Sequence, residues 1–416
     1  MQHSIKKFSL FIVLLVAFLD MMGIGLVYPM FSSMLYHNKI QLLSPDVSDA
    51  ARGMWLGILL CSMPIAQFFS SPILGALSDQ KGRKPVLKYA LLACACGYLI
   101  STWGVYQESL FLLIFGRIIV GIGAGTFSVV SAVLADISKP EEKAKNFGLQ
   151  NMAFGVGFMV GPFMGGLLSD SGFWRLGDYD KPFIFASLST LLNLALLWCF
   201  FKETHHTLKA KPLNWVVGII NLKKAMGLPV LRSLYGAVFL FVVGWSFYWE
   251  FIPVTWIKEY QLDSMQIGTL YAYGGGIYAL SCGLLIRPIV NRFPAPKVLF
   301  WSLSLGGLYI YLMLLHMPLS LFWLYIPLQQ FLIAMIFPTA SASVSNLAEN
   351  DAQGETLGIL QSIISVSFAL SPLMSGIFVG LSSRAPIIVG GTAMLLAALV
   401  TALGNRKMVF EKTKKL

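Results

Sequence analysis

The chain has 416 residues, of which 56% are hydrophobic and only 12% are charged, and its mean hydropathy is +0.73. A soluble domain carries about 25% charged residues. This composition therefore excludes a water-soluble protein and predicts an integral membrane protein. The net charge of +11 does not indicate a nucleic-acid partner, because the basic residues follow the expected membrane topology.

Long apolar runs recur along the whole chain. A bilayer-spanning helix needs about 20 mainly apolar residues, and backbone groups in lipid must be satisfied within the protein. Such runs are therefore expected to be helices, and the chain is predicted to be an all-α membrane protein with twelve transmembrane helices. The twelve runs are residues 8–32, 53–77, 86–105, 109–135, 147–169, 182–201, 233–257, 265–288, 298–316, 319–346, 356–380 and 386–404.

The basic residues indicate which ends of the runs face the cytoplasm. With both termini inside, the inner segments hold 23 of the 30 Lys and Arg residues, as the positive-inside rule requires. The first run is too long for a signal-peptide core, so we expect a membrane helix there. A multi-pass protein of a cell membrane, by default a bacterial inner membrane, is expected, with both termini cytoplasmic.

The first run contains an acid, Asp20, in the sequence LDMMGIGLVYP. An ionisable group inside a membrane helix costs about 2.5–3.5 kcal/mol on insertion scales and is by default a functional candidate. Gly23, Gly25 and Pro29 follow it and permit close packing and a bend. The structural alternative is a polar anchor between two helices.

A compact charged turn joins the second and third runs. Its sequence, GALSDQKGRKPVL at residues 75–87, resembles the loop between helices 2 and 3 of the major facilitator superfamily of transporters. The matching residues are Gly75, Leu77, Ser78, Asp79, Gly82, Arg83, Lys84 and Leu87. The resemblance implies two pseudo-symmetric six-helix bundles, residues 1–201 and 233–416, joined by a cytoplasmic linker at residues 202–232. It also implies a binding site between the bundles near the midplane.

The segment around Asp20 is similar to helix 1 of the drug/proton antiporters of that superfamily, the tetracycline exporters especially, with their D-x-x-G-I-G-L-x-x-P pattern. In the fourth run, Arg117 opens RIIVGIGAG and resembles the family pattern R-x-x-x-G-x-x-G. Arginine stays protonated in proteins, so Arg117 is expected to act on a nearby acid rather than to carry the proton. The alternative is a structural arginine that bonds backbone carbonyl groups.

The resemblance also implies a cytoplasmic gate. In related transporters the equivalent charges link helices 2, 4 and 11 when the cytoplasmic side is closed. The expected gate residues are Gly75, Asp79, Gly82, Arg83, Lys84 and Asp136. The alternative is a solvated turn that carries ordinary positive-inside charges.

The fifth run contains GVGFMVGPFMGG at residues 155–166, which resembles the helix 5 signature of antiporters. Its small residues flatten one face, and its proline removes a backbone donor and bends the helix. The residues that carry the resemblance are Gly157, Gly161, Pro162, Gly165 and Gly166.

Several pairs of residues repeat at an offset of 210, among them Asp136 with Asn346 and Pro162 with Pro372. The charged turn has a degraded partner, VNRFPAPKVL at residues 290–299, in which Asn291 replaces Asp79. These pairs support a duplicated architecture. Between the halves, residues 213–224 predict a short helix on the membrane surface, with Lys223 and Lys224 reaching lipid head groups. The alternative is a tether with no further role.

The seventh run carries a second acid, Glu250, within GWSFYWEFIPVTW. Aromatic rings beside an acid suit proton exchange and a planar or cationic ligand. The alternative is a residue of the membrane interface, where aromatic residues gather. The expected substrate-cavity residues are Trp245, Tyr248, Trp249, Tyr273, Tyr325 and Gln329. Single polar residues in the runs, such as Gln67, could bridge helices.

The sequence lacks a phosphate-binding loop and metal-ligand spacing, so no metal, cofactor or enzymatic activity is expected. The hypothesis is a secondary transporter working by alternating access, a proton-coupled exporter of small, partly hydrophobic molecules, with Asp20, Arg117 and Glu250 in proton coupling. Its partners are the substrate, protons and membrane lipid, and a monomer is expected. The alternatives are a proton-coupled importer of a nutrient, metabolite or siderophore, and a non-transporting scaffold or sensor.

Overall fold

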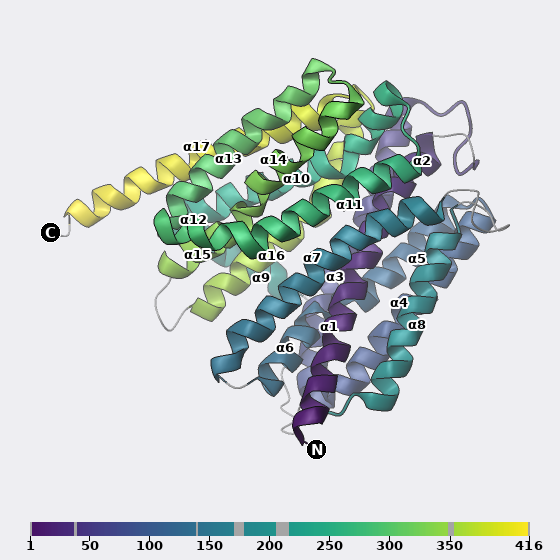
Figure 1. Ribbon diagram of the computed structural model, residues 1–416, viewed down its shortest axis with the longest axis horizontal. Coiled ribbons are helices and arrows are strands. Elements are labelled where there is room, and N and C mark those ends of the chain that lie inside the picture. Colours follow the sequence, from purple (N-terminus) through teal and green to yellow (C-terminus); the bar gives the residue numbers. More distant parts are fainter. Residues whose placement is uncertain are drawn as a thin grey trace. The chain divides into compact units, whose positions relative to one another are not determined.

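The computed structural model describes residues 2–36, 40–138, 140–169, 179–204, 216–347 and 353–414, and all regular elements in these residues are helical (Figure 1). The first half holds α1 (Gln2–Leu26), α2 (Tyr28–Tyr36), α3 (Asp49–Lys81), α4 (Arg83–Tyr106), α5 (Leu110–Gly123), the 3-10 turn η1 (Ala124–Thr126), α6 (Phe127–Ile137), α7 (Pro140–Leu168) and α8 (Lys181–Phe200). The second half holds α9 (Val217–Met226), α10 (Pro229–Tyr260), α11 (Ser264–Leu280), the π-helical turn η2 (Ser281–Leu285), α12 (Ile286–Arg292), α13 (Ala295–Tyr311), η3 (Leu312–Leu315), η4 (Leu319–Leu321), α14 (Phe322–Ala334), α15 (Ile336–Leu347), α16 (Gln353–Val379) and α17 (Ala385–Lys414).

The all-helical prediction is confirmed, and each predicted run contains helix. Ten spans in the described residues are long and apolar enough to cross a membrane. The fifth run forms α7, whose apolar part, Met152–Leu168, is shorter. The eighth run is divided among α11, η2 and α12. The predicted surface helix is α9, which begins at Val217, and residues 213–215 lie outside the described residues.

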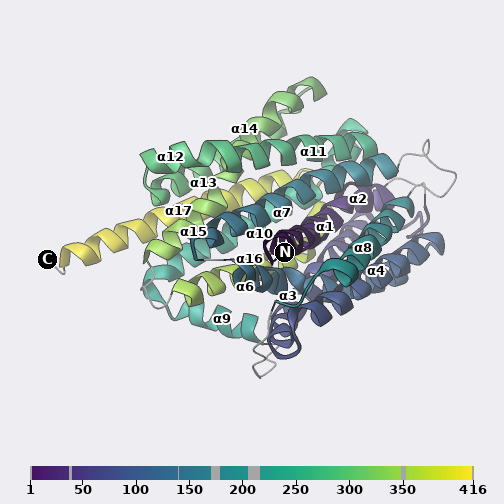
Figure 2. The ribbon, with the colours of Figure 1, turned by 60° about the horizontal axis from the view of Figure 1, so that its bottom comes forward.

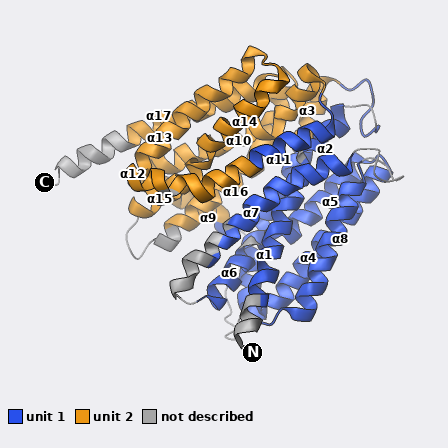
Figure 3. Cartoon of the chain, viewed as in Figure 1, with its two compact units in different colours: residues 1–47, 58–217, 262–275 blue, residues 48–57, 218–261, 276–416 orange. Residues whose placement is uncertain are grey.

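The chain forms two compact units, each with its own core. Unit 1 comprises residues 1–47, 58–217 and 262–275, and unit 2 comprises residues 48–57, 218–261 and 276–416 (Figure 3). Two helices are therefore divided between the units: the start of α3 clusters with unit 2, and most of α11 clusters with unit 1. The core of unit 1 includes a cluster of fully buried aliphatic side chains from α1, α4, α6 and α8, such as Val13, Leu87, Val133 and Leu197.

Glycines let α1 and α7 lie side by side in unit 1 (Figure 2). A Cβ atom on Gly157, Gly161 or Gly165 would overlap the backbone oxygen of an α1 residue. Because these glycines recur every four residues, they lie on one face of α7 and form a shallow groove for α1. The predicted signature of the fifth run therefore holds the helix that carries Asp20.

Both units contain a broken helix. In unit 1 the turn η1 separates α5 from α6, and in unit 2 Met335 separates α14 from α15. Pro338 has no N–H to pair with the carbonyl oxygen of Ala334, four residues earlier. The thiol of Cys282 lies 3.7 Å from that oxygen and donates to it. A side chain from a neighbouring helix thus replaces the missing backbone bond.

The groove on α7 generates a prediction about stability. We expect Gly161→Ala to destabilise the protein by about 1–3 kcal/mol, because the added methyl group overlaps the α1 backbone at Met22 and Leu26. The measurement is the melting temperature of the detergent-purified protein, followed by dye labelling of its buried cysteines.

Gly236→Ala on α10 is the matched control, because a Cβ atom there meets nothing within 4 Å. Its melting temperature should equal or exceed that of the wild type, since alanine favours a helix over glycine. Equal melting temperatures for the two variants would contradict the inference that Gly161 allows close contact between α7 and α1.

Candidate functional site

A buried carboxyl group lies in the middle of unit 1. Asp20 on α1 is only 9% exposed, and the hydroxyl group of Thr126, in η1, donates a hydrogen bond to its Oδ2 atom. Cys94 and Tyr98 of α4 lie close enough to Asp20 for their charges to interact. The site can therefore hold an ionised or a protonated carboxyl group with a hydroxyl partner in place.

Arg117 of α5 lies in the same buried region and is 2% exposed. Its Nη2 atom lies 2.9 Å from the sulfur of Met63, and its guanidinium carbon lies 5.6 Å from the centre of the Phe31 ring. The contact with the ring stabilises the cation. Arg117 and Asp20 both act electrostatically on Cys94 and Tyr98. The structure thus places both predicted proton-coupling residues of unit 1 in one region.

Three of the expected gate residues, Asp79, Arg83 and Asp136, lie together in unit 1. The Nη1 atom of Arg83 lies 2.7 Å from Asp79 Oδ1, and its Nε atom lies 3.0 Å from Asp136 Oδ2. Arg83 is 4% exposed, whereas the side chains of Asp79 and Asp136 are 19% and 22% exposed, so the ion pairs are only partly shielded from solvent. One arginine thereby joins the ends of α3, α4 and α6. The ammonium group of Lys84 instead donates to the carbonyl oxygen of Trp198, 3.1 Å away.

Two glycines shape the turn beside this cluster. Gly82 has a φ of +94°, a conformation that side-chain-bearing residues rarely adopt, so glycine is required where α3 gives way to α4. A Cβ atom on Gly75 would lie 3.1 Å from the hydroxyl oxygen of Ser128, so the end of α3 packs tightly on α6.

Glu203, just after α8, is a member of this cluster that the sequence analysis missed. Its Oε1 atom accepts the backbone N–H of Arg83 at 2.9 Å, and its Oε2 atom accepts that of Lys84 at 2.9 Å. A carboxylate at a helix N-terminus satisfies unpaired N–H groups and complements the helix dipole. Glu203 is 120 residues from Arg83 in the chain, so no local spacing could reveal the contact.

The remaining glycines of α7 contact two other helices. Pro162 packs against Gly25 of α1, and Gly166 packs against Gly268 of α11 within unit 1. The predicted antiporter-type helix is therefore the common support of α1 and of this part of α11.

Glu250 lies in unit 2, on α10, and is 4% exposed. The hydroxyl group of Ser246, one turn earlier, donates to its Oε1 atom at 2.8 Å. On the same helix the indole rings of Trp245 and Trp249 stack with their centres 5.1 Å apart. The second predicted acid therefore lies beside aromatic rings.

Three of the predicted cavity residues form a chain of polar contacts in unit 2. The hydroxyl oxygens of Tyr248 and Tyr325 lie 3.5 Å apart, and Gln329 Nε2 donates to Tyr325 at 3.1 Å. The ring of Tyr309 stacks on that of Tyr325 at 4.8 Å. Tyr273 lies on the part of α11 that belongs to unit 1.

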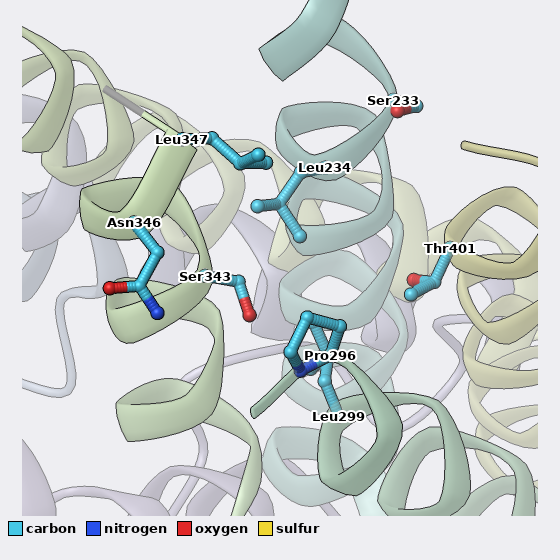
Figure 4. A pocket seen from close by; sticks show the side chains of 8 residues that line it. All are labelled: Ser233, Leu234, Pro296, Leu299, Ser343, Asn346, Leu347 and Thr401. Atoms are coloured by element: carbon cyan, nitrogen blue, oxygen red, sulfur yellow. The ribbon is translucent and has the colours of Figure 1, made fainter. Parts of the chain in front are cut away.

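A small cavity of about 90 Å³ lies within unit 2, between α10, α13, α15 and α17 (Figure 4). It is lined by Ser233, Leu234, Pro296, Leu299, Ser343, Asn346, Leu347 and Thr401. None of the predicted substrate residues lines it, and its volume is that of about three water molecules. It is too small to be the binding site of a drug-sized molecule.

Ion pairs also occur at the C-terminal end of α10. Lys258 Nζ lies 2.6 Å from Asp49 Oδ2, at the start of α3, within unit 2. Arg384 Nε lies 3.0 Å from Glu259 Oε1, and this carboxylate raises the pKa of the exposed guanidinium group. Local sequence patterns do not reveal these pairs, because the partners are more than 100 residues apart.

The contact of Glu203 with the start of α4 generates a prediction. Glu203→Gln keeps the size of the side chain but leaves one acceptor where the structure uses two. We expect the first turn of α4 to open more often, with amide hydrogen exchange in residues 83–88 faster by about five-fold, the equivalent of about 1 kcal/mol. Mass spectrometry of peptides from this segment measures the exchange.

Glu108→Gln is the control, because Glu108 is an exposed carboxylate outside this cluster. Exchange in residues 83–88 should match the wild type in that variant. Unchanged exchange in Glu203→Gln would show that the carboxylate does not support α4.

Comparisons with known proteins agree with the fold and the loop motif. A family model described as the Major Facilitator Superfamily matches residues 11–287 and 234–409. The tetracycline resistance protein, class C, of Escherichia coli is 30% identical over 375 residues, which cover 88% of each chain. Multidrug resistance protein 2 of Bacillus subtilis is 26% identical over 420 residues, which cover 98% of each chain.

Solved structures show the same fold. A D-xylose-proton symporter matches with a TM-score of 0.74 at 16% identity, over 94% of this chain and 97% of that one. The human organic anion transporter MFSD10 matches with a TM-score of 0.69 at 21% identity, over 95% of this chain and 99% of that one. With the family model and the class C relative, these likenesses confirm the resemblance carried by residues 75–87: the chain belongs to the major facilitator superfamily of membrane transporters.

Proposed function

We propose that the protein is a proton-coupled exporter of small, partly hydrophobic molecules. The observation that carries the proposal is the buried carboxyl group of Asp20, which a hydroxyl group from another helix holds. A buried carboxyl group with a partner that accommodates both protonation states is suited to bind and release a proton. The names of the relatives, which are resistance proteins for tetracycline, quinolones or several drugs, favour export over import.

The proposed cycle couples protonation of Asp20 to the direction that the site faces. Substrate and proton bind preferentially to different conformations, so each displaces the other. One proton that moves down a potential of 100 mV releases about 2.3 kcal/mol, which is enough for about fifty-fold accumulation of substrate. Arg117 keeps the surroundings of Asp20 positively charged, and Glu250 is the candidate for a second proton site.

Other residues have proposed roles in this cycle. The bundles at residues 1–201 and 233–416 move against each other, and residues 202–232 connect them. The ion pairs of Arg83 with Asp79 and Asp136 stabilise the state in which the cytoplasmic side is closed, and they break in the state in which it is open. The aromatic residues near Glu250 contact the substrate. The protein acts as a monomer in a bacterial inner membrane, with both termini in the cytoplasm.

Inverted membrane vesicles with an acid interior provide the test. A quenched pH dye reports the interior, and tetracycline and a fluoroquinolone are added in turn. We expect dye fluorescence to recover when a substrate enters in exchange for protons, and Asp20→Asn to abolish the recovery because the amide cannot be protonated.

Asp46→Asn, in an exposed loop, is the control and should behave as the wild type. Equal recovery in Asp20→Asn and the wild type would contradict the role of Asp20. No response from well-expressed wild type across a wider panel of compounds would contradict export.

A further inference from the structure

The hydroxyl group that donates to Asp20 belongs to a 3-10 turn between two α-helices. Thr126 is the last residue of η1, between α5 and α6, and its side chain is 0% exposed. Threonine is stiff about χ1, so the direction of its hydroxyl group follows the backbone at its own position. Hydrogen bonds in a short 3-10 turn are poorer than in an α-helix, so the turn depends on outside support.

That support comes from α3. Gln67 Nε2 donates to the carbonyl oxygen of Ala124, in η1, at 2.9 Å, and Ser70 Oγ donates to that of Gly121 at 3.1 Å. In the other direction, Ser128 Oγ donates to the carbonyl oxygen of Ser71 at 2.8 Å. Three hydrogen bonds to α3 therefore surround the turn.

The backbones of the two helices are also in direct contact. A Cβ atom on Gly121 would overlap the carbonyl oxygen of Met63, and one on Gly125 would lie 2.8 Å from the amide nitrogen of Ser71. Because no side chain separates them, a displacement of α3 is transmitted to the turn. All these residues belong to unit 1.

Unit 2 contains a related contact without the hydroxyl group. At the offset of the two charged turns, Ser70 corresponds to Cys282, which donates to the carbonyl oxygen of Ala334 beside the helix break. At the offset of the repeat, Thr126 corresponds to Ile336, which cannot donate a hydrogen bond. Unit 2 thus has one contact of this kind, whereas unit 1 has two donors from α3 and a hydroxyl group aimed at an acid.

We propose that Gln67 and Ser70 are positioning residues for the proton step: they hold the Ala124–Thr126 turn, and so the Thr126 hydroxyl group, against Asp20. The inference rests on the proposed function and adds a link within it. The helix α3, whose last turn carries the proposed gate residue Asp79, also sets how readily Asp20 releases its proton. Movement of α3 during gating then changes the protonation of Asp20.

The ionisable groups within electrostatic range of Asp20 are Cys94 and Tyr98 on α4, and Arg117 on α5 acts on the same two residues. The described side chains of α7 include no ionisable group. On α6, Asp136 is paired with Arg83 at the cytoplasmic end. None of these groups is altered by the substitutions below, so they form a constant background.

Infrared spectroscopy of the full-length protein in lipid tests the inference without a substrate. The carbonyl stretch of a protonated carboxyl group is followed during a pH titration, and the band lost in Asp20→Asn is assigned to Asp20. In Thr126→Val we expect the pH midpoint to rise by about one unit, because a donor to the carboxylate is lost. Gln67→Leu and Ser70→Ala should move the midpoint in the same direction by less.

Two controls separate this effect from a general loss of packing. Thr126→Ser keeps the hydroxyl group, and its midpoint should stay near that of the wild type. Ser62→Ala removes a buried hydroxyl group of α3 that donates only to Leu59 of its own helix, and it should titrate as the wild type. Ser70→Ala keeps the test valid if Gln67→Leu does not fold.

A wild-type midpoint in Thr126→Val, or in both α3 variants, would overturn the inference. These outcomes are distinct from failure of the proposed function, which appears as an absence of proton movement in the vesicle assay while the infrared midpoints shift as expected. Midpoints that stay fixed while vesicles exchange protons for substrate would overturn the inference alone.

Discussion

Polar groups inside a membrane helix have no water to bond with, so their partners must come from other helices. The hydrogen bond from Thr126 to Asp20 is the clearest case, because it joins an acid on α1 to a turn that interrupts the fourth span. Much of unit 1 follows from this requirement. Glycines on α7 bring α1 close, glycines on α5 and η1 bring α3 close, and side chains of α3 bond the carbonyl groups of the turn.

The two halves share an architecture but differ in chemistry. At one end of unit 1, Arg83 joins Asp79 and Asp136, whereas the corresponding residues of unit 2 are Ala295, Asn291 and Asn346. About one turn from these charges along α4 and α6, unit 1 is packed with aliphatic side chains such as Leu87 and Val133. Unit 2 has Leu299 and Ser343 at the corresponding positions and contains a small cavity. The Arg83 charge cluster thus lies in the half that holds Asp20, and the small cavity lies in the other half.

The helix α3 connects several of these features. Its end carries Asp79 of the charge cluster, its middle supports the Ala124–Thr126 turn, and its start belongs to unit 2. A helix that makes contacts at its start, its middle and its end is suited to transmit a displacement from one of these positions to another. This property follows from backbone contacts at Gly121 and Gly125, which leave no flexible side chains between the helices.

The sequence by itself determined the class of the protein, its helical spans and its family. Apolar run lengths depend only on bilayer thickness, and the turn at residues 75–87 is a local motif that needs glycine at position 82. It also identified the residue types that are costly in lipid, Asp20, Arg117 and Glu250. These inferences depend on local composition and spacing, which a single chain displays in full.

Only the tertiary structure decided which side chains meet. Thr126 and Glu203 carry no motif, and their partners are 106 and 120 residues away in the chain. Gln67 was recognisable as a polar residue in an apolar run, but not as the donor to Ala124. The physical reason is that hydrogen bonds between membrane helices depend on which helix faces lie together. That choice is made by packing across the whole unit, and local spacing does not encode it.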